Sequence, residues 1–321
     1  MTVEHAPMTL SAHIYATIML GLLCGWYFLI LLLVPTLVIA TYAYRSFTIG
    51  TLLAGLLFMT VVPLDHTPDT AFMYSSWWKP LRDYFSFETD VSSMKFEDGK
   101  KYMFMEFPHG VFPMGQFLSA SVIETMFPGK MICGLGADVI FYFPFMRQVM
   151  AWIGTRPASK KSIKKILDTG NHVAIIPGGI AEMFLSDAEN ECIYFKKRYN
   201  TCKAAIENGC DIVPTYFFGN TKQFEVIGSS TSGSWFSKVL ARLSRKLRMS
   251  IVFFYGRFFL PIPFRHPIKM VSCEVVKVEQ CDNPTEAQVK DVQNRVMASL
   301  TRMYETSGKK PSWETRPLII K

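Results

Sequence analysis

The 321-residue sequence lacks the cysteine patterns that mark disulfide-rich domains and zinc sites. Its seven cysteines are odd in number, and no two of them form a C-x-x-C pair. Such scattering argues against a disulfide framework and against a zinc cluster. We therefore expect no metal site, and we expect reduced thiols facing the cytosol at Cys24, Cys133, Cys192, Cys202, Cys210, Cys273 and Cys281.

Two further signatures are missing. The sequence contains no G-x-S-x-G nucleophile motif, which argues against a serine hydrolase. No nucleic-acid-binding motif accompanies the net charge of +8 and the isoelectric point of about 9.0. The excess of basic residues instead suits anionic membrane faces or phosphate-bearing ligands, so we expect no nucleic-acid partner.

Charged residues are absent from Ile14 to Tyr44, and no lysine or arginine precedes Arg45. A second apolar run extends from Phe47 to Leu64. A spanning helix needs roughly 20 apolar residues, and the missing basic segment argues against a cleavable signal peptide. We predict a helical hairpin that either crosses the membrane or re-enters it, with helices at about Ile14–Val38 and Phe47–Val62 and a turn at Thr41–Ser46.

The hairpin suggests a division of the chain into residues 1–66, the membrane hairpin, and residues 67–321, a membrane-associated domain. Half of the residues are hydrophobic and the mean hydropathy is +0.19, which fits a protein that is part lipid-embedded and part globular. Lys79 and Arg82 follow the second apolar run, and the remaining chain is basic. The positive-inside rule therefore places both termini and the domain on the cytosolic side.

Beyond the hairpin, strand-like and helix-like segments alternate, which predicts an α/β layer architecture. Ser159 can cap one helix, and Thr285 with Gln288 forms a capping box for another. The loop Gly228–Ser234 is expected to be flexible. We predict strands at residues 102–107, 131–136, 172–179, 211–219 and 249–256, and helices at residues 122–127, 159–170, 199–210 and 284–305.

His109 stands at the end of the buried strand 102–107, beside Gly110. An imidazole with its usual pKa of about 6.5 can act as a general base near neutral pH. Gly110 allows a ligand to approach the backbone closely, and its N–H group can face a developing oxyanion. The spacing alone equally permits a buried histidine that merely bonds a backbone carbonyl.

A second candidate site is the glycine turn Pro177-Gly178-Gly179, which follows another predicted strand and precedes Glu182. Such a turn can offer backbone donors to a phosphate or an oxyanion. Glu182 can orient an imidazole from there. It can equally be a carboxylate near a helix N-terminus, where the helix dipole favours it.

In this order, these motifs resemble the type-2 diacylglycerol acyltransferase family, which includes monoacylglycerol and wax-alcohol acyltransferases. The family marker H-P-H-G corresponds to Phe107-Pro108-His109-Gly110, with Phe107 replacing the first histidine. The family motif Y-F-P corresponds to Tyr142-Phe143-Pro144, and P-G-G-x-x-E to Pro177-Gly178-Gly179 with Glu182. Partial matches follow at Arg198, at "DIVPTYFFGN" with Asn220 in place of an acid, and at "GRFFLPIPFRHP". The likeness covers nearly everything after Lys100.

The resemblance implies a glycerolipid-acyltransferase-like mixed sheet flanked by helices, and an acyl-CoA-dependent O-acyltransferase. It implies that His109 is the general base and that Glu182 steadies its ring, since the acid of the related H-x-x-x-x-D motif is absent: Met114 stands five residues after His109. Oxyanion donors are expected at Gly110, Gly178 and Gly179. Substrate contacts are expected at Pro108, Tyr142, Phe143 and Pro144, and contacts with the CoA phosphates at Arg198, Lys203, Arg257 and Arg265.

The expected acceptor is diacylglycerol and the expected product is triacylglycerol. Acyl-CoA is a substrate in this scheme, and no cofactor is expected. The resemblance further implies a multi-pass protein of the endoplasmic reticulum membrane, with lipid droplets as a second location, and it leaves a homo-oligomer open. Monoacylglycerol and long-chain alcohols remain alternative acceptors, and a non-enzymatic lipid-droplet scaffold remains an alternative to catalysis.

Overall fold

A seven-stranded mixed sheet forms the centre of the protein, in the order β1-β10-β7-β2-β5-β3-β4. The computed structural model describes residues 7–185, 189–227, 239, 252–306 and 308–321. All neighbouring strands of the sheet are parallel except β10 and β7, which are antiparallel. The strands are β1 (Glu88–Asp90), β2 (Lys101–Phe107), β3 (Ile132–Gly136), β4 (Arg156–Pro157), β5 (His172–Ile175), β7 (Cys210–Phe218) and β10 (Lys269–Ser272). The predicted mixed α/β architecture is confirmed.

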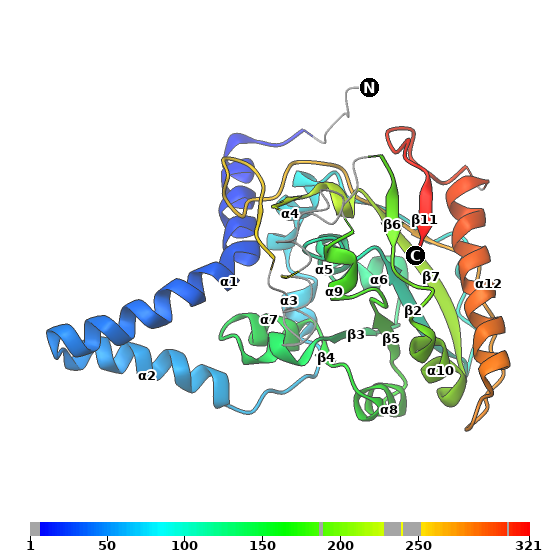
Figure 1. Ribbon diagram of the computed structural model, residues 1–321, viewed down its shortest axis with the longest axis horizontal. Helices are drawn as coiled ribbons and strands as arrows, with labels where there is room; N and C mark the ends of the chain where they lie inside the picture. Colours follow the sequence, from blue (N-terminus) through cyan, green and yellow to red (C-terminus); the bar gives the residue numbers. More distant parts are fainter. Residues whose placement is uncertain (1–6, 186–188, 228–238, 240–251, 307) are drawn as a thin grey trace.

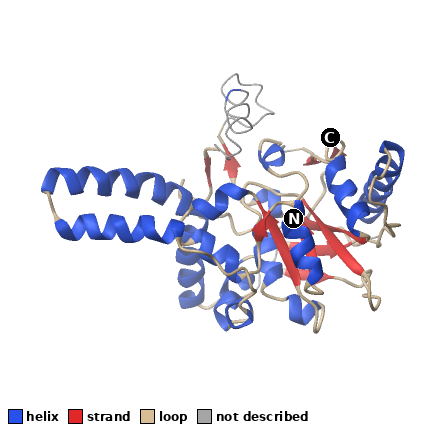
Figure 2. Ribbon diagram, turned by 90° about the horizontal axis from the view of Figure 1, so that it is seen from below, coloured by secondary structure: helices blue, strands red, loops and turns tan. Residues whose placement is uncertain are grey.

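Helices cover both faces of this sheet (Figures 1 and 2). The described helices are α1 (Leu10–Tyr44), α2 (Phe47–Val61), α3 (Thr70–Met73), α4 (Lys79–Tyr84), α5 (Met114–Ala120), α6 (Ile123–Met126), α7 (Met146–Trp152), α8 (Lys160–Asp168), α9 (Ile180–Met183), α10 (Tyr199–Asn208) and α12 (Glu286–Glu305). Short 3₁₀ turns lie at η1 (Ser76–Trp78), η2 (Asp138–Tyr142) and η3 (Asn220–Lys222). Two small sheets pair β6 (Glu191–Ile193) with β11 (Leu318–Ile320), and β8 (Glu225–Val226) with β9 (Phe254–Tyr255).

The central strand β2 divides the core because successive strand side chains point to opposite faces. Met103, Met105 and Phe107 pack into a cluster with residues of α8, α10 and α12. Tyr102 and Phe104 instead join the cluster that contains residues of α1, α4 and α5. Residue 106 therefore faces the α1 side of the sheet, and residue 107 faces the α12 side.

The predicted helix ends are largely correct because they follow from local hydrogen bonding. The Ser159 hydroxyl accepts the N–H of Ser162 at the start of α8, and Thr285 with Gln288 forms the capping box of α12. The segment predicted as a helix at 122–127 is the single turn α6. In the strand predicted at 249–256, the described part forms only β9. The loop Gly228–Ser234 lies outside the described residues.

The N-terminal hairpin projects from the domain as two adjacent helices (Figures 1 and 2). The 35-residue helix α1 is longer than predicted at both ends, and it is long and apolar enough to cross a membrane. Its first half packs into the core through Ala16, Leu20 and Cys24, whereas α2, which is described throughout, buries none of its side chains. Thirty-five helical residues extend about 52 Å against a hydrocarbon layer of about 30 Å, which leaves length for this packing.

Candidate active site

His109 follows β2 at the carboxyl end of the strand, in the loop that leads into α5. The parallel neighbour β5 ends at the same edge of the sheet, and there it continues into the turn Pro177–Gly179 and α9. Loops at the carboxyl ends of adjacent parallel strands meet, which is where open α/β sheets bind ligands. The sheet therefore brings together two motifs that lie about 70 residues apart in the sequence.

Glu182 reaches His109 through the main chain rather than through the ring. Its Oε2 accepts the His109 backbone N–H at 2.7 Å, and its Oε1 accepts the Tyr194 backbone N–H at 2.9 Å. Both carboxylate oxygens are thus occupied by amide groups. The expectation that Glu182 holds the imidazole ring itself needs correction, because the carboxylate fixes the backbone that carries the ring.

The His109 ring is oriented by its own loop instead. Its Nδ1 lies 2.9 Å from the Gly110 carbonyl oxygen. A carbonyl oxygen can only accept a hydrogen bond, so Nδ1 carries the proton and donates it. Nε2 is then unprotonated, with a lone pair that can accept a proton.

Burial sets the charge state of both groups. Desolvation lowers the pKa of His109 below its usual 6.5, and the hydrogen bond to Gly110 opposes this only in part, so the ring is neutral at pH 7. Desolvation raises the pKa of Glu182 to about 7, although the N–H groups of His109 and Tyr194 favour its ionised form. His109 can therefore act as a neutral base, and the Glu182 carboxylate that holds its backbone titrates near neutral pH.

The glycine turn is shaped around the Glu182 side chain. A Cβ atom at Gly178 would lie 1.9 Å from the Glu182 carboxyl carbon, so only glycine fits there. Arg198, which the resemblance placed at the CoA phosphates, donates from Nη2 to the Gly178 carbonyl oxygen at 2.9 Å. Its guanidinium also lies over the Tyr194 ring. In this structure Arg198 thus supports the turn that carries Glu182.

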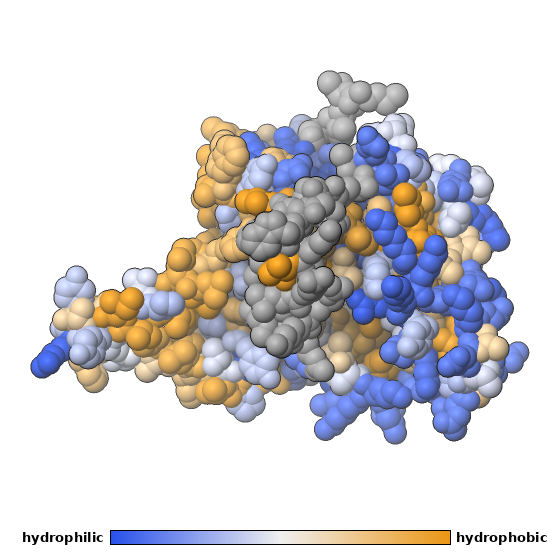
Figure 3. Space-filling model, in the orientation of Figure 1, coloured by the Kyte–Doolittle hydropathy of each residue, from blue (hydrophilic) through white to orange (hydrophobic). Residues whose placement is uncertain are grey.

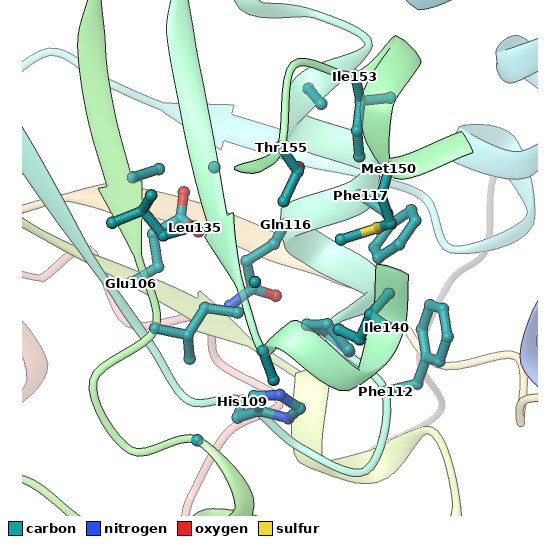
Figure 4. Close-up of a pocket in the computed structure, with 18 of the residues that line it drawn as sticks. Glu106, His109, Phe112, Gln116, Phe117, Leu135, Ile140, Met150, Ile153 and Thr155 are labelled. Atoms are coloured by element: carbon teal, nitrogen blue, oxygen red, sulfur yellow. The ribbon is translucent and has the colours of Figure 1, made fainter. Parts of the chain in front are cut away.

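A cavity of about 450 Å³ adjoins His109 (Figure 4), a volume within the range of small-molecule sites. Its wall is mainly apolar and comes from α1, α5, η2, α7 and the strands β3 and β5. Phe143 and Gly179 belong to this wall. The polar and ionisable side chains in the described lining are few, and they include Tyr27, Glu106, His109, Gln116, Ser119 and Thr155.

Several predicted site residues lie elsewhere. Tyr142 is 69% exposed, and the Pro144 carbonyl accepts the indole N–H of Trp26. Arg257 donates to the Tyr84 hydroxyl, and Arg265 donates to the Tyr84 carbonyl oxygen, near the N-terminal end of α1. Three further predicted residues also lie outside the described lining of the cavity: Pro108 and Gly110 in a small recess beside Glu191 and Arg316, and Lys203 on α10, where it pairs with Glu207.

Phe107, at the position of the first histidine of the family marker, points away from the cavity. It is fully buried on the α12 side of the sheet, with its ring edge-on to Phe195 at 5.1 Å between centroids. A side chain at this position cannot reach the His109 ring from the opposite face. The replacement of histidine by Phe107 is therefore compatible with an active site at His109.

Asn220 is a site residue that the sequence showed only as a departure from the family pattern. It is 1% exposed and begins η3, directly after Gly219 at the end of β7. Its Nδ2 donates to the carbonyls of Pro108 and His109 and to Gln116 Oε1, and its Oδ1 accepts the Gly115 N–H at 2.9 Å. One amide thus joins β7 to both ends of the histidine loop.

Replacing Asn220 with aspartate should loosen this loop, because a carboxylate cannot donate to the two carbonyl groups that Nδ2 now serves. We expect the free energy of unfolding to fall by about 1–3 kcal/mol and kcat to fall at least about tenfold. Thermal unfolding and turnover of the purified variant measure the two effects. Asn208→Asp on α10 is the matched control, and equal losses in both variants would contradict the role assigned to Asn220.

Comparison with known proteins agrees with the motifs. The diacylglycerol acyltransferase family model matches residues 46–321, which is most of the chain. The protein belongs to this family. As a member of the family it is an acyltransferase of lipid metabolism, and the resemblance drawn from the ordered motifs is confirmed.

The family relatives differ in the acceptors that their names state. The chain is 30% identical over 246 residues to diacylglycerol O-acyltransferase 2-like protein 6 of Bos taurus, covering 71% of this chain and 72% of the relative. It is 28% identical over 291 residues to diacylglycerol O-acyltransferase 2 of Xenopus laevis, covering 84% and 80%. It is 26% identical over 275 residues to 2-acylglycerol O-acyltransferase 1 of Homo sapiens, covering 80% and 82%.

Similarity extends to a solved structure. The 1-acyl-sn-glycerophosphate acyltransferase PlsC of Thermotoga maritima aligns with a TM-score of 0.39 and 13% sequence identity. The alignment covers 86% of this chain and 97% of that chain.

Proposed function

We propose that this acyltransferase moves a fatty acyl group from acyl-CoA to the free hydroxyl of diacylglycerol and so makes triacylglycerol. The observation that carries the proposal is the position of His109, a neutral imidazole in the wall of a large apolar cavity. A thioester is already activated, so the protein has to make a lipid hydroxyl nucleophilic. A positioned base does this and accelerates transfer by roughly 10²–10⁴-fold.

His109 Nε2 takes the proton of the acceptor hydroxyl while the hydroxyl oxygen attacks the thioester carbonyl carbon. The tetrahedral intermediate collapses by breaking the carbon–sulfur bond. The departing CoA sulfur then recovers the proton from the imidazolium, which restores the neutral ring. Gly179 lies in the cavity wall and is the best placed of the three predicted oxyanion donors. Glu182 holds the His109 backbone in place through its hydrogen bond to the His109 N–H. The phosphate contacts predicted for Arg198, Lys203, Arg257 and Arg265 remain predictions.

The hairpin and its position beside the cavity support an association with the membrane. Exposed apolar side chains cover the projecting hairpin (Figure 3), among them Leu32, Ile39, Phe47, Phe58 and Val61. Leu23, Trp26 and Tyr27 of α1 line the cavity, so the hairpin leads from a lipid phase to His109. The 15 residues of α2 extend about 22 Å, less than the hydrocarbon thickness of about 30 Å. We propose a hairpin that enters the endoplasmic reticulum membrane and turns back, with the domain on the cytosolic side.

The acceptor is tested by supplying labelled oleoyl-CoA to membranes that contain the full chain, with diacylglycerol, monoacylglycerol or hexadecanol. We expect the highest kcat/KM with diacylglycerol and labelled triacylglycerol as the main product. A higher kcat/KM with monoacylglycerol or hexadecanol would identify that lipid as the acceptor in place of diacylglycerol. A protein that labels none of the three acceptors would overturn the proposed activity.

A further inference from the structure

Glu106 is an ionisable side chain in the cavity wall that the proposed mechanism does not use. Strand alternation on β2 turns it to the same face as Phe104, and both residues line the cavity that adjoins His109. Figure 4 shows Glu106 in this wall. Glu106 is 8% exposed. Within the described part of the chain, its carboxyl group makes no hydrogen bond and no ion pair, and burial is the cause of its pKa shift. A buried polar group in this situation requires an explanation.

The surroundings of Glu106 decide its protonation state. Desolvation raises the pKa of the Glu106 carboxyl to about 8. At neutral pH the group is therefore mainly a neutral carboxylic acid, which can donate one hydrogen bond and accept others. Leu135 and Ile175, which also line the cavity, are apolar. Thr215, which pairs with Glu106 in register on β7, donates its hydroxyl proton to the Val213 carbonyl oxygen. A hydrogen-bond partner can instead come from the molecule that fills the cavity.

We propose that Glu106 donates a hydrogen bond to an oxygen atom of the bound lipid and thereby selects lipids with an oxygen near the reacting group. This inference rests on the proposed function, since it takes the lipid to react at His109. Glu106 precedes His109 by three residues, so their Cα atoms are at most about 11 Å apart. The ester carbonyl of a glyceride lies a few bonds from its free hydroxyl, whereas a long-chain alcohol has no second oxygen.

Two kinds of lipid oxygen can accept this hydrogen bond: the ester carbonyl of the acceptor, and an oxygen on the acyl chain of the donor. The acceptor source is tested with dioleoylglycerol against its dialkyl ether analogue, which lacks the carbonyl groups. The donor source is tested with 12-hydroxyoleoyl-CoA against oleoyl-CoA. Each comparison is a ratio of kcat/KM values in membranes that contain the full chain.

We expect the wild-type protein to prefer the ester over the ether by about five- to tenfold, the effect of one hydrogen bond. Glu106→Leu should bring this ratio close to one, whereas Glu106→Gln should keep most of it, because its amide still donates. Glu88→Leu, an exposed position on β1, is the matched control and should leave the ratio unchanged. If Glu106→Leu instead abolishes only a preference for 12-hydroxyoleoyl-CoA over oleoyl-CoA, the oxygen that accepts the hydrogen bond belongs to the acyl chain of the donor. The proposed hydrogen bond from Glu106 is then supported.

The pH dependence of the ratio provides a readout that does not depend on the leucine variant folding. Above about pH 8 the Glu106 carboxyl loses its proton and can no longer donate, so the ester preference of the wild type should fall there. His109, Tyr27 and Cys24 are the other titratable groups of the described lining, and all three remain in Glu106→Gln. If the ester preference of Glu106→Gln does not change with pH, the decrease seen in the wild type is therefore assigned to Glu106.

The inference is overturned if Glu106→Leu transfers acyl groups with both wild-type ratios intact, or if neither wild-type ratio changes between pH 7 and pH 9. Failure of the proposed function looks different, because the wild type would then acylate no glyceride and no ratio could be formed.

Discussion

Replacing His109 with glutamine should lower kcat by about 10²–10⁴-fold, because an amide of similar size cannot accept the hydroxyl proton. Glutamine keeps the polarity and approximate volume of the side chain, so the loop and its hydrogen bonds to Glu182 and Asn220, which involve the main chain, should persist. Single-turnover transfer from labelled oleoyl-CoA measures the effect, with the protein level in the membranes checked in parallel.

His172→Gln is the matched control for that experiment. His172 begins β5, and its ring is buried against Phe96 and Tyr102, outside the described lining of the cavity. Burial lowers the pKa of His172 to about 4, so its ring is neutral like that of His109, but it lies outside the described lining of the cavity. This variant should unfold at a lower temperature but retain its turnover per folded molecule. Retention of wild-type kcat by His109→Gln would remove His109 from the mechanism.

Replacing Glu182 with glutamine should have the second largest effect. Glutamine has one acceptor oxygen where the carboxylate offers two, so either the His109 or the Tyr194 amide loses its partner inside the protein. An unsatisfied buried amide costs about 1–3 kcal/mol of folding free energy. We also expect kcat to fall by about 10²-fold, because the His109 ring moves with its backbone. KM should change little, since Glu182 does not line the main cavity.

The pH profile separates Glu182 from His109. In the wild type, kcat should fall as the pH drops through about 7, because protonated Glu182 can no longer accept both amides, and fall again below 6.5 as His109 is protonated. In Glu182→Gln the first decrease should vanish and the second should remain. Glu207→Gln, a partly exposed partner of Lys160, is the control and should lose no more than about 1 kcal/mol. A Glu182→Gln variant that is as stable and as active as the wild type would refute the positioning role.

The structure also explains which expectations from the sequence were wrong or incomplete. Glu182 was expected near His109 and is in direct contact with it, yet the spacing of two motifs cannot distinguish a ring from the backbone beneath it. Arg198 was expected at a phosphate; it donates to the Gly178 carbonyl oxygen, and its phosphate contact stays a prediction. The strands β1, β4 and β10 are too short for an alternating side-chain pattern to be visible in the sequence, so they are recognisable only from their pairing.

The sequence by itself determined the features that depend on neighbouring residues: the apolar hairpin, the helix caps at Ser159 and Thr285, the buried strands β2 and β7, and the ordered family motifs. These follow from local hydrogen bonds and from side-chain periodicity. Only the tertiary structure decided what surrounds Glu182, Asn220 and Glu106, because their surroundings consist of atoms that are distant in the sequence and all three side chains are buried. The contact of Glu182 with His109 spans 73 residues and that of Asn220 with Gly115 spans 105, distances over which no local pattern carries information.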